Sequence, residues 1–122
     1  MADGSKGERI AAWYLERQGF RVVARNYRIR QGEIDLVAEN DTYLLFVEVK
    51  TRKADAWLRG EDAVDTHKQT RLRAAAAHYL AQSDFDAVPG QASEKQPRFD
   101  VICIEALPEG RWGIRWYRDA FQ

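Results

Sequence analysis

The sequence contains little that could cross-link the chain or hold it in a membrane. Its single cysteine, Cys103, excludes an internal disulfide and a cysteine-based zinc site. No apolar run approaches the ~20 residues that a membrane-spanning helix needs. The first residues are polar and carry charges of both signs, which is not typical of a secretory signal. These absences predict a protein of the reducing cytoplasm with no membrane partner.

The composition is that of an ordinary globular protein. Hydrophobic residues make up 45% and charged residues 31% of the 122 residues, and this length predicts a single domain, residues 1–122. The 19 basic and 19 acidic residues balance, which argues against indiscriminate nucleic-acid binding. However, the mainly acidic residues 31–66 lie between the basic segments 1–30 and 67–80. This distribution suits a site that holds a cation and faces a polyanion, although charges scattered over a solvated surface are the simpler alternative.

The first half of the chain predicts a helix followed by three strands. Residues 5–18 have helical spacing, Ser5 and Glu8 form a capping-box pattern, and Gly19 stands where a helix-ending glycine would. Alternating or β-branched stretches with turn residues between them then predict strands at residues 20–27, 33–38 and 43–50.

The second half predicts a helix and two more strands. After a polar loop over 51–65, Thr66 and Gln69 form a second capping-box pattern, and the helix continues to near Ser83. Residues 84–97 have no periodicity and predict a loop. Residues 99–105 and 112–117 predict strands joined by a turn. The order is α-β-β-β-α-β-β, and the helix after the third strand predicts a parallel crossover to the fourth. We therefore expect an α/β fold, a mixed five-stranded sheet flanked by helices.

Three charged residues of the second and third predicted strands can share one face of the sheet. Glu48 and Lys50 do so because they stand two apart on one strand. Asp35 joins them if the hairpin loop has an even length. A two-residue loop (40–41) puts Glu48 on the diagonal from Asp35, a four-residue loop (40–43) opposes the two directly at ~5 Å between Cβ atoms, and a three-residue loop separates them.

This face is otherwise apolar, so the acidic pair needs a compensating charge. Two ionised carboxylates there would repel each other and lose hydration. Mg²⁺ prefers one or two carboxylates together with waters and phosphate oxygens, so Asp35 and Glu48 are candidate ligands of Mg²⁺ or Mn²⁺. Lys50 beside them could orient an attacking water or neutralise charge on a phosphate in reaction. The alternative is a buried ion pair between Lys50 and one of the acids.

Other charged residues could extend the site. Glu8 lies on the same side of its helix as Ala11, Ala12 and Leu15, so it is expected to face the sheet and reach the metal or its waters. It could equally serve only as the capping partner of Ser5. Lys68 and Arg71, near the start of the second helix, could bind phosphate or simply belong to a solvated face.

Several aromatic residues and one further acid have two interpretations. Trp57, in the loop after the third strand, could stack on an unpaired base or close over the core. Trp112, Trp116 and Tyr117 are expected in the core or on a self-association surface. Asp100 is expected to make a structural hydrogen bond at a strand entry, with a supporting role at the site as the alternative.

The motifs that carry these residues resemble a known family. The runs are GERIAAWYLERQGFRVVARNYR, GEIDLVAEN, LLFVEVKTR, KQTRL and RFDV, which span most of the chain in this order. They resemble the uncharacterised bacterial YraN-like family. That family is similar to the PD-(D/E)xK nucleases, which have the restriction-endonuclease-like fold, and to archaeal Holliday-junction resolvases.

The resemblance implies a role for each matching position. Glu8 matches the acid of the N-terminal helix, and Asp35 matches the first motif acid. Glu48 and Lys50 match the (D/E)-x-K pair, and the backbone carbonyl of Val49 would join the metal ligands. The proline that usually precedes the aspartate in this superfamily is replaced here by isoleucine.

The function implied is that of a Mg²⁺- or Mn²⁺-dependent endonuclease that hydrolyses phosphodiester bonds in DNA, notably branched or otherwise structured DNA. A catalytically inactive module on the same fold, binding nucleic acid or protein, is the alternative. Neutral overall charge suggests that a homodimer or a partner protein supplies part of the DNA contact. The basic residues expected to contact phosphates are Arg28, Arg30, Arg52, Lys68 and Arg71.

Overall fold

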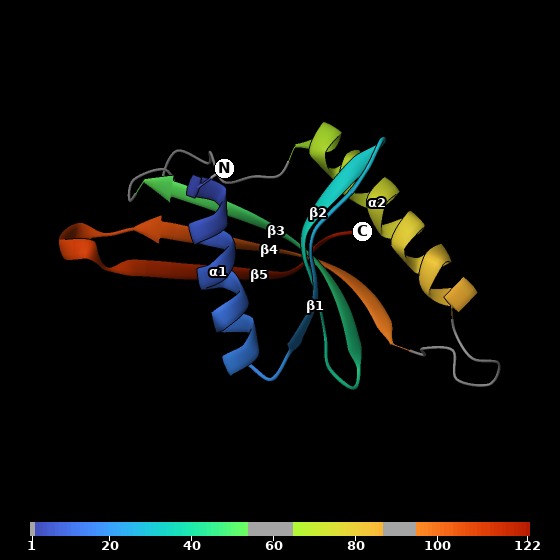
Figure 1. The fold of residues 1–122 in the computed structure, drawn as a ribbon. Coiled ribbons are helices and arrows are strands. Elements are labelled where there is room, and N and C mark those ends of the chain that lie inside the picture. Colours follow the sequence, from blue (N-terminus) through green and yellow to red (C-terminus); the bar gives the residue numbers. More distant parts are fainter. Residues whose placement is uncertain (1, 54–64, 87–94) are drawn as a thin grey trace.

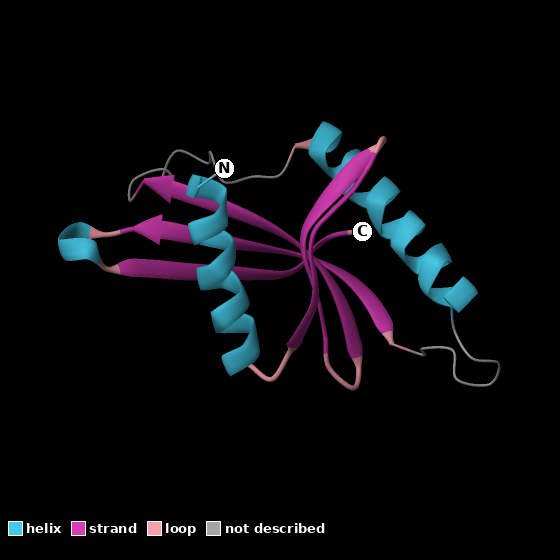
Figure 2. Cartoon of the chain, viewed as in Figure 1, coloured by secondary structure: helices cyan, strands magenta, loops and turns pink. Residues whose placement is uncertain are grey.

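The computed structural model describes residues 2–53, 65–86 and 95–122 and shows an α/β fold (Figure 1). A five-stranded sheet has the order β1-β2-β3-β4-β5, and α1 and α2 pack against it (Figure 2). Trp57 and most of the two long predicted loops lie outside the described residues. The elements are α1 (Ala2–Arg17), β1 (Arg21–Ile29), β2 (Gly32–Glu39), β3 (Tyr43–Lys53), α2 (Thr66–Asp86), β4 (Gln96–Ala106), a short 3₁₀ helix (Pro108–Gly110) and β5 (Trp112–Phe121).

The predicted element order and crossover are confirmed. β3 and β4 pair in parallel, as expected of two strands joined through a helix, and the other three strand pairs are antiparallel. In the part of the chain that is described, neither helix is both long and apolar enough to cross a membrane.

The helix ends follow the predictions at one terminus only. Gly19 has a φ of +92°, and the N–H groups of Gly19 and Phe20 donate to the carbonyls of Glu16 and Leu15, which closes α1 in a Schellman motif. The capping box at Ser5 was wrong, because α1 already begins at Ala2. A serine is only a modestly poor helix former, so it does not prevent the helix from extending upstream.

The predicted start of α2 at Thr66 is confirmed, but the capping-box assignment is wrong. Oδ1 of Asp65 accepts a hydrogen bond from the backbone N–H of Lys68 (2.8 Å), so Asp65 caps the helix rather than Thr66 with Gln69. Aspartate is a stronger N-cap than threonine, because its carboxylate also interacts favourably with the positive end of the helix dipole.

Each helix covers one face of the sheet. The α1 face holds Ala11, Ala12 and Leu15 against alternate residues of the strands, among them Val47 and Ile102. The α2 face holds a second cluster. Its buried residues are Leu72, Ala75 and Ala76 of α2 with Ile34, Val37, Leu44 and Phe46 of the sheet. Since Phe46 belongs to the α2 face, Glu48 and Lys50 of β3 lie on that face too.

The register between β2 and β3 is the one that opposes the two acids. Pairing runs from Glu39↔Leu44 to Leu36↔Val47, which is the four-residue-loop alternative. One step further along this register, Asp35 stands opposite Glu48. The hydrogen-bonded pairing of β2 with β3 ends one step earlier, at Leu36↔Val47, and Figure 1 shows the β1–β2 hairpin and the end of β3 running in different directions. The acids therefore lie where the two strands part.

Candidate functional site

Asp35 and Glu48 form the centre of the site. Oδ2 of Asp35 accepts a hydrogen bond from the backbone N–H of Val49 (2.8 Å), which ties the aspartate to the strand that carries Glu48. Burial raises the pKa of Asp35, and the negative charge of Glu48 raises it further, to about 7. Two carboxylates on neighbouring strands thus repel each other in a partly buried position, as the predicted arrangement requires.

Lys50 brings a buried amine to the same strand. Its side chain is 5% exposed, and burial lowers the pKa of Lys50, with the positive charges of Arg52 and Lys68 acting in the same direction. Glu48 opposes this shift. Nζ of Lys68, which projects from the first turn of α2, lies 3.9 Å from Oε1 of Glu48. The start of α2 is therefore part of the site.

Glu8 approaches from the other helix. It is partly buried at the head of the stripe that continues through Ala11, Ala12 and Leu15. Burial raises the pKa of Glu8, and the charge of Asp35 raises it too, so the two carboxylates are within electrostatic reach. Gly7, the residue before Glu8, packs closely on the side chain of Thr51. A Cβ there would lie 2.5 Å from Oγ1 of Thr51, just beyond Lys50 on β3.

Asn26 is a site residue that sequence reasoning missed. Continuous pairing on both sides of it, Arg25↔Leu36 and Tyr27↔Ile34, sets Asn26 opposite Asp35. Its φ is +50°, and a hydrogen bond from its side chain counteracts the rise in the pKa of Glu8. An asparagine within a strand pattern is the available signal, because asparagine tolerates positive φ better than other non-glycine residues.

The donor chemistry of this site fits a hard divalent cation. Carboxylate oxygens are the ligands that Mg²⁺ and Mn²⁺ prefer, and a shared cation would relieve the repulsion that raises the pKa of Asp35. Within residues 2–53, 65–86 and 95–122, no group of three or more His, Cys, Asp or Glu side chains is arranged to hold a metal. Asp35 and Glu48 would therefore be its two carboxylate ligands, and water or substrate oxygens would complete the shell.

The predicted basic residues surround this centre unequally. The charge of Arg28, which pairs with Glu33 at 3.1 Å, lowers the pKa of Glu8, and that of Arg52 lowers the pKa of Lys50. Lys68 lies beside Glu48, as described above. Arg30 is exposed in the turn between β1 and β2. Arg71 lies one helical turn beyond Lys68, and its backbone carbonyl lies against Gly32, the residue that follows the β1–β2 turn. Contact of these five with nucleic acid stays a prediction.

Sequence comparison gives these residues a family context. The family model described as "Uncharacterised protein family UPF0102" matches residues 7–104, from the first turns of α1 into β4. The chain belongs to UPF0102. This membership confirms the YraN-like resemblance, and the matched segment contains every residue of the site.

Similar UPF0102 proteins match this chain over most of their length. The chain is 43% identical to the UPF0102 protein of Symbiobacterium thermophilum over 119 residues, which is 97% of this chain and 94% of the relative. It is 40% identical to that of Nitrosococcus oceani, over 98% of this chain and 90% of the relative. With the UPF0102 protein of Syntrophus aciditrophicus it shares 38% identity, over 100% and 90% of the two chains.

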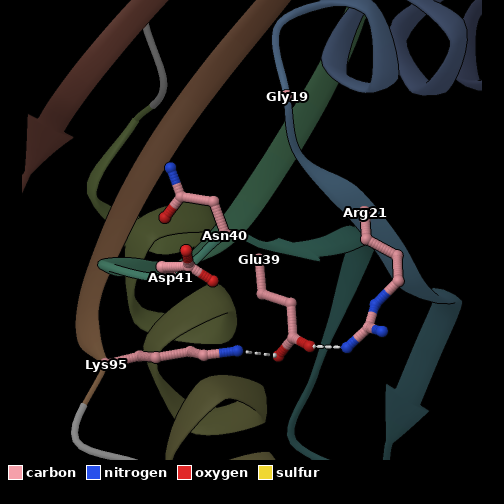
Figure 3. Close-up of a pocket in the computed structure, with 6 residues that line it drawn as sticks. All are labelled: Gly19, Arg21, Glu39, Asn40, Asp41 and Lys95. Atoms are coloured by element: carbon pink, nitrogen blue, oxygen red, sulfur yellow. Dashed lines mark hydrogen bonds and ion pairs between the residues drawn. The ribbon is translucent and has the colours of Figure 1, made fainter.

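A second pocket of this UPF0102 chain lies at the opposite end of β2, at the hairpin loop (Figure 3). Glu39 is bound there from two sides, by Arg21 and by Lys95 at 3.2 Å. Although burial alone would raise it, these hydrogen bonds lower the pKa of Glu39. The charge of this carboxylate is thus compensated by its two basic partners.

Asp100 makes the structural hydrogen bonds that were predicted, although it lies within β4 (Gln96–Ala106) rather than at the entry of the strand. It is fully buried and accepts hydrogen bonds from the guanidinium of Arg98 (two of 2.9 Å), Nε1 of Trp116 (2.8 Å) and the backbone N–H of Asp119 (3.0 Å). Cys103 is buried in the core on β4. Trp116 packs edge-on against Tyr14 and Phe20. These contacts bind β4, β5 and α1 together.

Proposed function

We propose that this chain is a divalent-metal-dependent endonuclease that hydrolyses phosphodiester bonds in structured DNA. The observation that supports it most directly is the electrostatic repulsion between Asp35 and Glu48 where β2 and β3 part, with buried Lys50 on the same face as Glu48. Two carboxylates can hold a metal ion that assists phosphodiester hydrolysis, and an amine beside them can stabilise the charge that develops on the phosphate.

Each residue has a defined task in this proposal. Asp35 and Glu48 would hold Mg²⁺ or Mn²⁺, with the Val49 carbonyl as the further ligand that the family resemblance implies, and Glu8 would act through a water. The bound cation would supply Lewis-acid stabilisation of the phosphate oxygens. The N–H of Val49 keeps the Asp35 carboxylate in place. Lys50 orients the attacking water and counters the negative charge that develops on the phosphate.

The proposal also specifies the kind of DNA that is cut. The resemblance to junction resolvases favours branched or structured DNA as substrate. Arg28, Arg52 and Lys68 lie near the acids, and they would contact phosphates on either side of the bond that is cut. With no net charge on the chain, a second copy or a partner protein would supply the rest of the DNA contact.

The proposal is tested by cleavage of junction, flap, nicked and linear DNA in Mg²⁺ or Mn²⁺. Asp35→Asn and Glu48→Gln keep the shape of the side chains but remove charge, and each should lower the cleavage rate at least about 100-fold. Glu39→Gln makes the same change at the far end of β2 and should cleave like the wild type. Equal behaviour of all four proteins on every substrate would overturn the proposal.

A non-catalytic binding module is the second candidate. It is favoured by Lys68, whose ammonium lies close enough to Glu48 to compensate part of the acidic charge without a metal. Such a module would bind DNA or protein through the same face and cleave none of the substrates. It would also gain no stability from divalent ions, and this difference separates the two candidates.

A further inference from the structure

A groove with an unusual composition runs between α1 and the edge strand β5. Its lining combines two tryptophans, two isoleucines and two cations, and it contains no acidic residue. Trp13 is 55% exposed, although large aromatic side chains are usually well buried. The lining residues are Lys6, Arg9, Ile10 and Trp13 of α1 with Trp112 and Ile114 of β5, around a cavity of about 440 Å³.

Each tryptophan of this groove has a cation near its ring, one from the lining (Lys6) and one from the next turn of α1 (Arg17). Nζ of Lys6 lies 4.9 Å from the centre of the Trp112 ring, and the guanidinium of Arg17 lies 5.2 Å from that of Trp13. Exposed aromatic faces interleaved with cations are the arrangement that binds unpaired nucleotides, because bases stack on the rings while phosphates meet the charges.

The groove lies beside the proposed active site on the same helix. Lys6 and Arg9 flank Glu8 in the sequence, and Trp13 follows Glu8 by five residues, or ~7.5 Å along the helix axis. Gly7, between Lys6 and Glu8, packs against Thr51 at the end of β3. A strand that leaves the acidic site across the start of α1 would pass Lys6 and Arg9 before it reached Trp13.

We infer that this groove binds single-stranded nucleic acid, namely the unpaired arm of the DNA on which the proposed nuclease acts. This rests on the proposed function for its substrate, but the binding itself does not require cleavage. Duplex DNA does not fit this chemistry, because its base faces are already stacked on one another. A symmetric dimer through the same groove is disfavoured, because it would bring together two copies of a lining that has two cations and no acid.

The test measures binding of labelled oligothymidylate by fluorescence anisotropy in EDTA, so that no cleavage contributes. Trp13→Ala should weaken binding about 10-fold, whereas Trp13→Phe, which keeps an aromatic face, should recover most of it. Lys6→Gln and Arg9→Gln should each reduce the slope of log affinity against log salt by about 0.7. Arg21→Gln removes one positive charge near the hairpin loop and should leave the slope unchanged. A matched duplex should bind more weakly and be insensitive to Trp13→Ala.

Three results would overturn the inference. The first is equal affinity of Trp13→Ala and the wild type for oligothymidylate. The second is competition by polyglutamate as effective as by an oligonucleotide of the same charge, which would indicate an acidic peptide. The third is loss of a dimer in Trp13→Ala, by sedimentation, with oligothymidylate affinity unchanged. If the wild type cleaves DNA and these variants bind oligothymidylate normally, only the inference about the groove is wrong. If binding depends on Trp13 and no substrate is cleaved, only the nuclease proposal is wrong.

Discussion

The carboxylate of Asp35 on β2 is hydrogen-bonded to the backbone N–H of Val49 on β3, 2.8 Å away, at the point where pairing between these strands ends. A backbone donor at this position favours the ionised aspartate, yet burial and the charge of Glu48 outweigh it. The position of the side chain is thus set by the fold, while its charge is unfavourable without a cation. Such a combination is common where proteins bind metal ions or carry out acid–base chemistry.

The first prediction concerns the dependence of stability on pH. The pKa of Asp35 rises from 3.8 to about 7 on folding, so between these values the folded chain binds more protons than the unfolded one. This aspartate should therefore lower the free energy of unfolding as pH rises from about 4 to about 7. The free energy of unfolding of Asp35→Asn should therefore rise relative to that of the wild type over this range. At pH 8 it should be higher by roughly 1–3 kcal/mol, measured by urea unfolding in EDTA.

Glu39→Gln is the control of opposite sign. The pKa of Glu39 is lowered on folding, so this carboxylate stabilises the protein above its unfolded pKa, and that contribution is lost as pH falls. The free energy of unfolding of Glu39→Gln should therefore decrease relative to that of the wild type as pH rises. If the difference between Asp35→Asn and the wild type stayed constant from pH 4 to pH 8, the aspartate would not have the raised pKa.

The second prediction is that Mg²⁺ or Mn²⁺ stabilises the folded chain. An ion that binds only the folded state at 100 times its Kd adds about 2.7 kcal/mol, which corresponds to a rise of several degrees in Tm. The rise should be larger at pH 8 than at pH 5, because at pH 5 Asp35 is protonated and cannot serve as an anionic ligand. Differential scanning calorimetry should show it in the wild type and not in Glu48→Ala. An equal rise in both proteins would place the ion elsewhere.

The hairpin that contains this pair shows what the sequence could and could not predict. Alternation placed Glu48 and Lys50 on one face, but it left two even loop lengths open, since both keep the same faces together. The structure selects the four-residue loop, in which Oδ1 of Asn40 accepts hydrogen bonds from the N–H groups of Thr42 and Tyr43. Which of several turn residues makes such bonds is decided by the whole loop, so spacing alone cannot predict it.

Asn26 and Asp65 show a different limit. Asn26 lies within a stretch that has good strand propensity, and nothing in the alternation of that stretch indicates its positive φ of +50°. Asp65 lies next to Thr66, and both are acceptable caps, so one residue of uncertainty was unavoidable. The buried face of α2 follows more directly from the sequence, because the apolar spacing of Leu72, Ala75 and Ala76 specifies one face of a helix.

The third prediction separates catalysis from packing at Lys50. Lys50→Met keeps most of the volume of a side chain that is 5% exposed and removes a charge whose burial is unfavourable. The variant should unfold within about 1 kcal/mol of the wild type, or be slightly more stable, and lose at least about 100-fold in cleavage rate. A fully active Lys50→Met would assign this lysine a purely structural role.

Lys68→Met is the matched control for Lys50. The same substitution here is at a side chain that is half exposed, 3.9 Å from Glu48. If Lys68 contacts only phosphate, its loss should raise KM for DNA and reduce the salt dependence of binding while kcat changes little. The contrast between the two lysines is read from single-turnover cleavage rates against binding affinities.

The fourth prediction concerns the glycine that lets α2 approach the sheet. A Cβ on Gly32, in the turn between β1 and β2, would overlap the backbone carbonyl of Arg71, and a backbone atom cannot rotate away. Gly32→Ala should therefore lower the free energy of unfolding by about 3 kcal/mol or more in chemical denaturation and move the start of α2, with Lys68, away from Glu48.

Gly7→Ala is the control, since its added Cβ would meet the hydroxyl of Thr51, which can change rotamer. Because alanine also favours the helix at position 7, that variant should stay within about 1 kcal/mol of the wild type. Similar losses for both alanines would mean that side-chain crowding in general, rather than the contact between the turn and the α2 backbone, limits what these two positions accept.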